Sequence, residues 1–164
     1  MILDKTAIRK IAKNRKKLES KLNLKIIIKG EEAELSGNEV DIFVGERVLN
    51  AIEKNFPIDS ALLLINENYF IEEIPIKSIR AKNLSVIRSR LIGTRGKTLK
   101  LISELSDCKV ALYENIISII GEADKMKIAV NAVKSLIKGS RQTNVYSYLE
   151  KHKKIDEQDL ELKE

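Results

Sequence analysis

The run from Gly93 to Lys97 holds the residue types best suited to binding an anion. Gly93 and Gly96 enclose Thr94 and Arg95, and Lys97 follows directly. Glycine lets the backbone approach a phosphodiester chain closely, because it has no Cβ. Free N–H groups at the start of a following helix favour an anion there, and Arg95 and Lys97 can add charge-assisted hydrogen bonds. The run therefore predicts a loop that contacts phosphates.

The same spacing also fits an ordinary turn between two helices. A chain with 7 glycines in 164 residues holds roughly 0.3 such pairs by chance, so the pair of glycines decides little by itself. The context favours the phosphate-contacting loop. Leu91 and Ile92 precede the first glycine, Arg88 and Arg90 add positive charge, and a helix is predicted directly after Gly96.

The elements predicted around this loop follow the order strand, helix, helix, strand, strand, helix. β-Branched and apolar runs predict the strands, and apolar residues at helical spacing predict the helices. The predicted strands are residues 69–76, 109–113 and 116–120, and the predicted helices are residues 83–91, 97–105, a long segment between the caps Asp124 and Gly139, and 145–154. The loop therefore lies between two helices.

The first half of the chain repeats this order. Strands are predicted at residues 1–3, 24–29 and 32–36, and helices at residues 5–22, with a break near Asn14, at 40–55 and at 60–65. The sequence thus predicts a mixed α/β (α+β) fold in which each half forms a three-stranded sheet backed by helices. We expect domains at residues 1–66 and 67–154, followed by an acidic flexible tail at residues 155–164.

Charge alternates along the chain in blocks. The protein is 43% hydrophobic and 33% charged, with a net charge of +6 and a pI of about 9.3. Residues 1–29 carry ten basic and two acidic residues, residues 30–76 carry two and eleven, and residues 77–109 carry nine and two. Two basic blocks in similar places of the two halves suit an anionic partner.

The remaining features argue against catalysis and bound metal. Cys108 is the single cysteine and His152 the single histidine, so neither a disulfide nor a cysteine-based zinc site can form within the chain. No stretch approaches the roughly 18 apolar residues of a membrane span, and the start lacks a signal-peptide pattern. With aromatic residues at 4%, base recognition by stacking is disfavoured. We expect a cytoplasmic, non-catalytic protein without metal or cofactor.

The run from Leu91 to Gly121 resembles a type I KH domain, in which a GxxG loop joins two helices and grips the RNA backbone. Residues 87–139, together with the segment Thr143 to Lys151, resemble more narrowly the archaeal and eukaryotic KH proteins of small-subunit ribosome assembly. This is the Dim-two or partner-of-Nob family, related to the Krr family. Its R-I-I-G-x-x-G-x-T core and V-Y-x-x-L-E tail correspond here to residues 90–98 and 145–150.

The resemblance implies two tandem type I KH-like domains that bind single-stranded RNA. It also implies contact with small-subunit ribosomal RNA near its 3′ end, and as partners an endonuclease that matures this end and the translation initiation factor two α subunit. The strand after the second helix would form the second wall of the RNA groove. The expected RNA-binding residues are Arg88, Arg90, Ile92, Gly93, Thr94, Arg95, Gly96, Lys97, Lys100, Lys109, Val110 and Leu112.

The first half departs from the family pattern. When Ile2 to Asn14 is laid on the first strand and helix, the loop falls at residues 12–15, which read Ala-Lys-Asn-Arg, and both glycines are missing. We therefore expect a degenerate domain that binds RNA weakly and with little sequence preference. Its basic residues either contact phosphates or form a solvated helix face.

Two other functions fit the same sequence. A degenerate pair of KH-like domains could act as a scaffold or protein-interaction module, with the acidic block Glu31 to Asp41 as a docking face. Alternatively, a KH protein could serve messenger RNA or an exonuclease complex.

Overall fold

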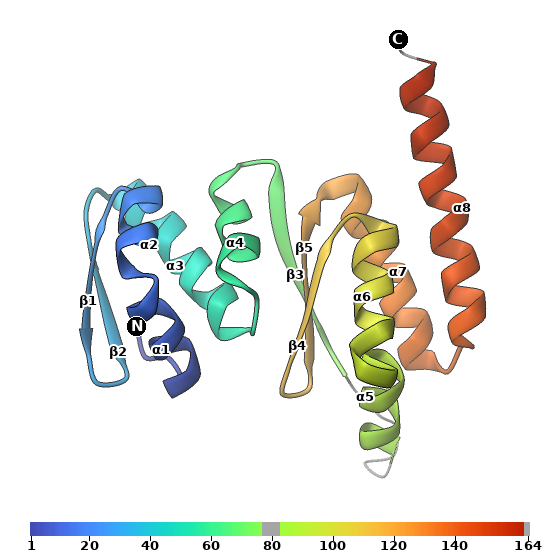
Figure 1. The fold of residues 1–164 in the computed structure, drawn as a ribbon, viewed down its shortest axis with the longest axis horizontal. Helices are drawn as coiled ribbons and strands as arrows, with labels where there is room; N and C mark the ends of the chain where they lie inside the picture. Colours follow the sequence, from blue (N-terminus) through green and yellow to red (C-terminus); the bar gives the residue numbers. More distant parts are fainter. Residues whose placement is uncertain (77–82, 163–164) are drawn as a thin grey trace. The chain divides into compact units, whose positions relative to one another are not determined.

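The computed structural model describes residues 1–76 and 83–162, and the chain divides into two compact units (Figure 1). We call Met1–Tyr69 unit 1 and Phe70–Glu164 unit 2. The boundary thus lies three residues after the predicted end of the first domain at residue 66. The mixed α/β class predicted from the sequence is confirmed.

Unit 1 pairs a short hairpin with helices. Its elements are α1 (Lys5–Lys13), α2 (Arg15–Leu22), β1 (Lys25–Lys29), β2 (Glu32–Ser36), α3 (Glu39–Glu53), α4 (Ile58–Ala61) and the 3-10 helix η1 (Leu62–Ile65). β1 and β2 are antiparallel, with Lys25 opposite Ser36 and Lys29 opposite Glu32. The break predicted near Asn14 within the helix over residues 5–22 is confirmed, because Asn14 separates α1 from α2.

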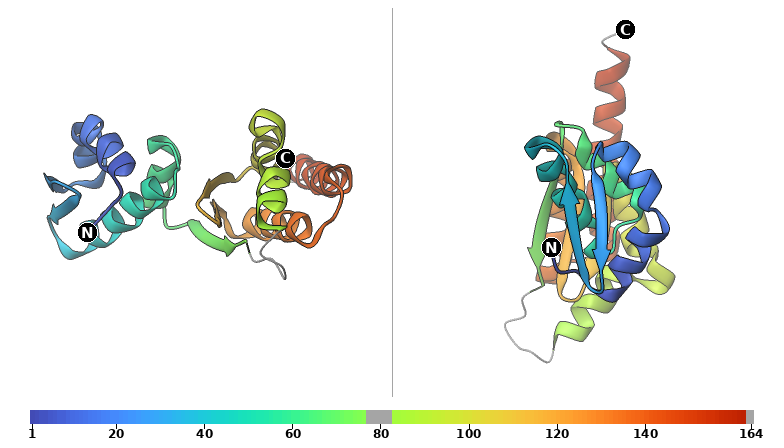
Figure 2. Two further views of the ribbon diagram at one scale, coloured as in Figure 1. Left: turned by 90° about the horizontal axis from the view of Figure 1, so that it is seen from below. Right: turned by 90° about the vertical axis from the view of Figure 1, so that its left-hand side faces the viewer.

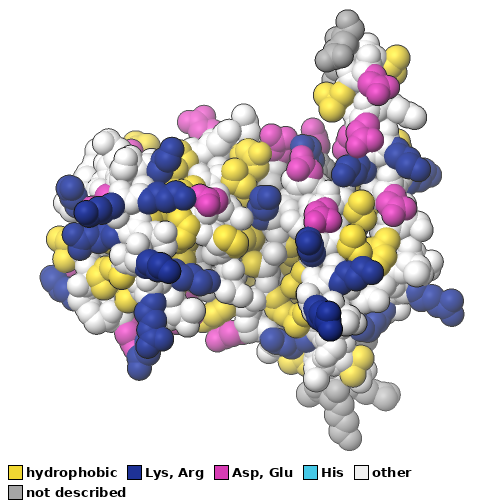
Figure 3. Space-filling model, in the orientation of Figure 1, with side chains coloured by type: hydrophobic (Ala, Val, Ile, Leu, Met, Phe, Trp, Pro, Cys, Tyr) yellow, Lys and Arg dark blue, Asp and Glu magenta, His cyan; other side chains and the backbone are white. Residues whose placement is uncertain are grey.

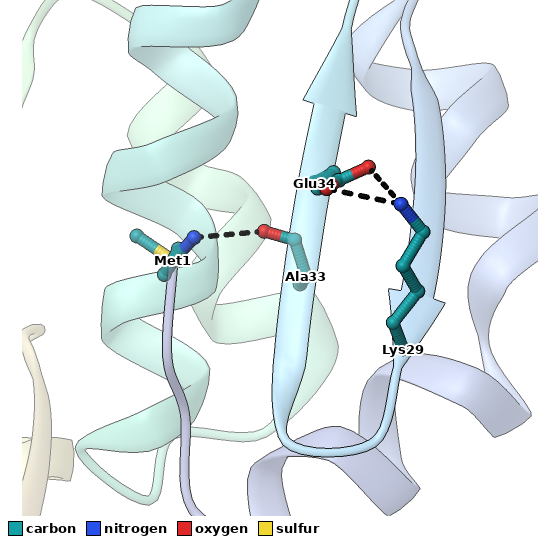
Figure 4. A network of polar contacts seen from close by, with 4 residues as sticks. All are labelled: Met1, Lys29, Ala33 and Glu34. Carbon is teal, nitrogen blue, oxygen red and sulfur yellow. Dashed lines mark hydrogen bonds and ion pairs between the residues drawn. The ribbon is translucent and has the colours of Figure 1, made fainter.

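The prediction of a third strand in unit 1 is wrong, because the sheet described there has two strands. Residues 1–3 form only one bridge, between Ile2 and Glu32. The N-terminal amino group of Met1 donates to Ala33 O at 3.0 Å, beside the Lys29–Glu34 ion pair of the hairpin (Figure 4). Asp4 explains the short pairing, because its Oδ1 accepts from Ala7 N at 2.6 Å and so caps α1 directly after Leu3. The chain turns into a helix before a ladder can extend.

Unit 2 contains a three-stranded sheet with its helices on one face (Figure 2). The elements are β3 (Tyr69–Pro75), α5 (Leu84–Ile92), the 3-10 turn η3 (Thr94–Gly96), α6 (Lys97–Ser106), β4 (Lys109–Tyr113), β5 (Ile116–Glu122), α7 (Ala123–Lys138) and α8 (Gln142–Glu161). The strand order is β3-β5-β4, so β4 is an edge strand. β4 and β5 are antiparallel, with Lys109 opposite Ile120 and Tyr113 opposite Ile116.

The core of unit 2 explains why these segments fold together. Ile117 and Ile119 of the central strand pack with Ile102 of α6 and with a buried face of α7. That face was predicted from its helical spacing, and it contains Met126, Ala129, Val130, Val133 and Leu136. Full burial of a Val, Leu, Ile or Met side chain contributes about 1.5–3 kcal/mol. The helix starts at Ala123, one residue before the predicted cap Asp124, and Gly139 ends it with a φ of +107°.

Helix α8 corrects the prediction for the end of the chain. Its first half belongs to the core, because Val145 and Leu149 are buried there. The helix expected to stop at Lys154 continues to Glu161 and extends past the other helices of unit 2 (Figure 1). The described part of the predicted loose tail is therefore helical. The segment contains no Gly or Pro to break the helix, and its Lys, Glu, Gln and Leu residues are good helix formers.

Cys108 is a buried thiol whose chemistry is suppressed by the fold. It is 2% exposed, and burial raises its pKa from 9.0 to about 11 because a thiolate would lose its hydration. A Cβ on the neighbouring Gly121 would lie 2.5 Å from its Sγ, so the site has no spare room. An inert, structural cysteine follows from this packing.

We expect an aromatic disulfide reagent to leave Cys108 unmodified in the native protein and to modify it rapidly in urea. Stability should also fall as pH rises from about 9 toward 11, since the unfolded thiol ionises first while the folded thiol keeps its proton. Absorbance of the released thiol and urea unfolding across pH measure the two effects. Fast, stoichiometric modification at neutral pH without denaturant would contradict this account.

Candidate nucleic-acid interface

The predicted loop lies where α5 ends and α6 begins. The N–H of Gly93 donates to Ser89 O at 2.9 Å and closes α5. The chain then leaves the helix, with Gly93 at φ +72° and ψ 179°, and makes a single 3-10 turn over Thr94–Gly96. Arg95 and Gly96 both have left-handed backbone angles. The resulting turn directs Thr94 and Arg95 to solvent, where both are exposed.

The two glycines of the loop have different physical roles. A Cβ on Gly93 would lie 2.2 Å from Thr98 Oγ1 and 2.9 Å from Thr98 N, so this position has no room for a side chain. A Cβ on Gly96 would meet no atom within 4 Å. Gly93 is therefore required by close packing and by its backbone angles, whereas Gly96 is required only by its positive φ.

Thr98 connects the loop to helix α8. Its side chain is 2% exposed, and its Oγ1 accepts hydrogen bonds from Gln142 Nε2 and Tyr146 Oη, both at 3.0 Å. Gln142 Nε2 also donates to Arg90 O at 3.0 Å. The Arg90 guanidinium donates in turn to Ser140 O. The start of α8 thus holds both helices that flank the loop.

The structure separates the predicted basic residues into two groups. Arg95, Lys97 and Lys100 are exposed around the loop and the first turns of α6, with Lys100 3.9 Å from Glu104. Arg90 is committed to Ser140 O, and the Arg88 guanidinium donates to Asn115 Oδ1 at 3.1 Å.

Strand β4 contributes the apolar part of the predicted site. It lies beside α6, the helix that follows the loop (Figure 1). Val110 and Leu112 are half-buried against the core of unit 2, and Lys109 is exposed at the start of the strand. Ile92, the last residue of α5, is also half-buried. Ile92 thus adjoins the loop in sequence, and Val110 and Leu112 lie on the strand beside α6. Among residues 1–76 and 83–162, β4 pairs only with β5.

Sequence reasoning missed a polar cavity on the side of the loop that faces α8. It measures about 710 Å³, and Ser85, Ser89, Thr94, Gln142 and Tyr146 contribute to its walls. The i, i+4 spacing of the two serines was a signal that they share one helix face. No local sequence pattern indicates that Gln142 and Tyr146 line this cavity, because their hydrogen-bond partners lie 44 to 52 residues away in sequence.

The described part of the chain, residues 1–76 and 83–162, shows no group of three or more His, Cys, Asp or Glu residues that could hold a metal ion. Within the same ranges, no helix is both long and apolar enough to cross a membrane.

Comparison with protein families finds one model that matches unit 2. It is the model for the second KH domain of PNO1, described as a eukaryotic type KH-domain (KH-domain type I), and it matches residues 70–154. A KH domain-containing protein of Methanocaldococcus jannaschii is 31% identical over 108 residues, which cover 65% of this chain and 48% of that protein. The pre-rRNA-processing protein PNO1 of Coccidioides immitis is 33% identical over 138 residues, or 79% and 54% of the two chains. This chain therefore spans about half the length of these relatives.

Two solved structures share the fold of almost the whole chain. Dim2p from Pyrococcus horikoshii superposes with a TM-score of 0.78 at 28% identity, covering 92% of this chain and 96% of that one. The complex of a/eIF2alpha, aDim2p and rRNA from the same organism contains a chain with a TM-score of 0.80 at 28% identity, covering 94% and 92%.

Proposed function

Because this chain belongs to the type I KH-domain family represented by the second KH domain of PNO1, we propose that it binds single-stranded RNA through unit 2. The observation that carries this proposal is the exposed turn of Thr94 and Arg95 between two positive-φ glycines. This turn lies at the start of α6, whose N-terminus has no side-chain cap.

The proposed grip on the RNA backbone is electrostatic. The N–H groups at the start of α6 and the positive end of its dipole favour a phosphate there. Arg95 and Lys97 add exposed positive charges on either side of Gly96. Thr94 can donate a hydroxyl hydrogen bond to a phosphate oxygen. Gly96 leaves open space, so a phosphodiester can approach the backbone of the turn.

We propose that β4 is the element that contacts the bases. Val110 and Leu112 offer an apolar surface to the bases. Because β4 is at the edge of the sheet, no other strand of the described residues pairs with the backbone N–H and C=O groups on its outer side. They can bond the edges of unstacked bases, as single-strand recognition requires. A duplex hides those edges, so the site favours single strands.

The proposed RNA is ribosomal. Relatives named for pre-rRNA processing and an aDim2p structure solved with rRNA and a/eIF2alpha support a role in small-subunit ribosome biogenesis. We place the contact near the 3′ end of small-subunit ribosomal RNA. The processing endonuclease and the initiation factor two α subunit are the proposed partners. In this role the protein is a cytoplasmic binder that positions RNA and catalyses no reaction.

A salt series with short RNAs tests this function. We expect the full chain to bind a single strand from the 3′ end of small-subunit ribosomal RNA more tightly than the same sequence annealed to its complement. The KH fold contacts about four nucleotides. A plot of the logarithm of the association constant against the logarithm of the salt concentration should therefore have a slope of about −3. Fluorescence anisotropy measures both quantities. Equal affinity for duplex and single strand, or no binding, would contradict the proposal.

A further inference from the structure

Unit 1 has a cavity at the junction of α1 and α2, where unit 2 has its loop. The cavity measures about 610 Å³ and is lined by residues 12–17 and by Ile28 of β1. It therefore combines the junction between two helices with the strand that follows the second helix. The same two parts, the loop and β4, form the proposed RNA site of unit 2.

The junction in unit 1 is built without glycine. Asn14, at φ −111° and ψ 15°, separates α1 from α2. Its Nδ2 donates to Lys10 O at 2.8 Å, and its N–H reaches the carbonyls of Lys10 and Ile11. The N–H of Asn14 is thus already bonded, and the junction lacks the left-handed turn of the other unit. The glycine turn that lets a phosphodiester approach the backbone in unit 2 is therefore missing here, which leaves the basic side chains as the main groups for binding a ligand.

Ile28 gives the cavity an apolar surface at the corresponding strand position. It is the fourth residue of five-residue β1, which pairs with β2 in an antiparallel hairpin. Leu112 is likewise the fourth residue of five-residue β4, paired in the same way with β5. Both side chains are half-buried. Unit 1 has therefore kept the strand side of the site while losing the loop.

Four basic side chains surround this cavity, and two of them are free. Lys17 pairs with Asp59 at 2.6 Å, and Arg15 approaches Glu19 at 3.7 Å. Within residues 1–76 and 83–162, the side chains of Lys13 and Lys16 have neither an ion pair nor a hydrogen bond, and both are exposed. Lys and Arg side chains gather on the face formed by α1 and α2 (Figure 3). The unpaired positive charges of Lys13 and Lys16 therefore favour an anion in this cavity.

We propose that this cavity is a second RNA contact, in which Lys13 and Lys16 hold phosphates of a single strand outside the segment bound by unit 2. This inference rests on the proposed function of unit 2. The contact is electrostatic and independent of sequence, because side-chain ammonium groups read charge while base identity is read at base edges. RNA is favoured over an acidic protein surface because the cavity repeats the helix-junction and strand arrangement of the other unit.

The test compares two RNAs and two charge-matched variants of the full chain. One RNA has about eight nucleotides and the other about twenty-four, both containing the same ribosomal 3′-end segment. Lys13→Gln with Lys16→Gln removes two charges from the cavity. Lys127→Gln with Lys134→Gln removes two charges from the exposed side of α7, in the other unit. Anisotropy titrations over a salt series give affinities and salt slopes.

We expect the cavity variant to bind the long RNA about tenfold more weakly than the α7 variant at about 0.1 M salt, with a salt slope reduced by about 1.4. Its affinity for the short RNA should match that of the α7 variant. If the two variants behave alike on the long RNA, or if the cavity variant weakens both RNAs equally, the second contact is overturned. If the unaltered chain binds neither RNA, the proposed function falls together with this inference.

Discussion

Replacing Thr94 and Arg95 together by Asp is expected to weaken RNA binding by the full chain about a hundredfold. The two carboxylates would stand where phosphates lie in the proposed complex. Each lost charge-assisted contact costs about 1–3 kcal/mol, and about 1.4 kcal/mol corresponds to a factor of ten. Repulsion adds to this loss. Anisotropy with a short single strand measures the effect.

The substitution should leave the fold intact. Both side chains are exposed, and Asp tolerates the left-handed backbone that Arg95 adopts at φ +54°. Lys127→Asp with Lys134→Gln is the matched control, because it changes the net charge by the same three units on exposed α7. Unaltered urea unfolding establishes that the loop variant is folded. Undiminished RNA affinity in that folded variant would remove the loop from the site.

Gly93→Ala is expected to destabilise unit 2 by about 3 kcal/mol, and Gly96→Ala by only about 1 kcal/mol. Gly93 occupies backbone angles that are almost restricted to glycine, which cost another residue about 1–3 kcal/mol. The new Cβ would also press on Thr98, only 2.2 Å from its Oγ1. At Gly96 only the backbone penalty of about 1–2 kcal/mol applies, because the space is open. Urea unfolding of the full chain, followed for each variant, measures both costs.

Thr98 provides the internal check on this difference. In a Thr98→Ala background the contact with Oγ1 is gone, so Gly93→Ala should cost less than it does beside threonine. Some cost remains, since Thr98 N lies 2.9 Å from the same Cβ position. The coupling isolates packing from backbone strain. Equal losses of unfolding free energy at Gly93 and Gly96 in the unaltered chain would show that the contact of the new Cβ with Thr98 does not destabilise the protein.

Local patterns were enough to predict most elements of unit 2. The buried face of α7, with Ala129, Val133 and Leu136, follows from helical periodicity. Gly139 ended that helix as predicted. The first strand of unit 1 was overestimated, because the capping strength of Asp4 competes with strand pairing over only three residues. The length of α8 was underestimated, because an acidic composition was treated as a sign of disorder although it contains good helix formers.

The site was predictable only in its exposed part. Arg95 and Lys97 follow from the loop itself, and the structure leaves both exposed. The hydrogen bonds from Gln142 and Tyr146 to Thr98 span 44 and 48 residues, and no local spacing encodes such contacts. For the same reason, the sequence could not show that the Arg90 guanidinium donates to Ser140 O, just past the end of α7. Tertiary packing decides which basic residues remain available to a ligand.

Photocrosslinking with peptide mapping tests the central claim most directly. A short single strand from the 3′ end of small-subunit ribosomal RNA, with one photoreactive uridine at each position in turn, is irradiated with the full chain. Mass spectrometry then identifies the crosslinked residues. The account predicts crosslinks within residues 92–100 and 109–113, where the loop and β4 lie. Crosslinks confined to other surfaces, such as the exposed side of α7, would contradict it.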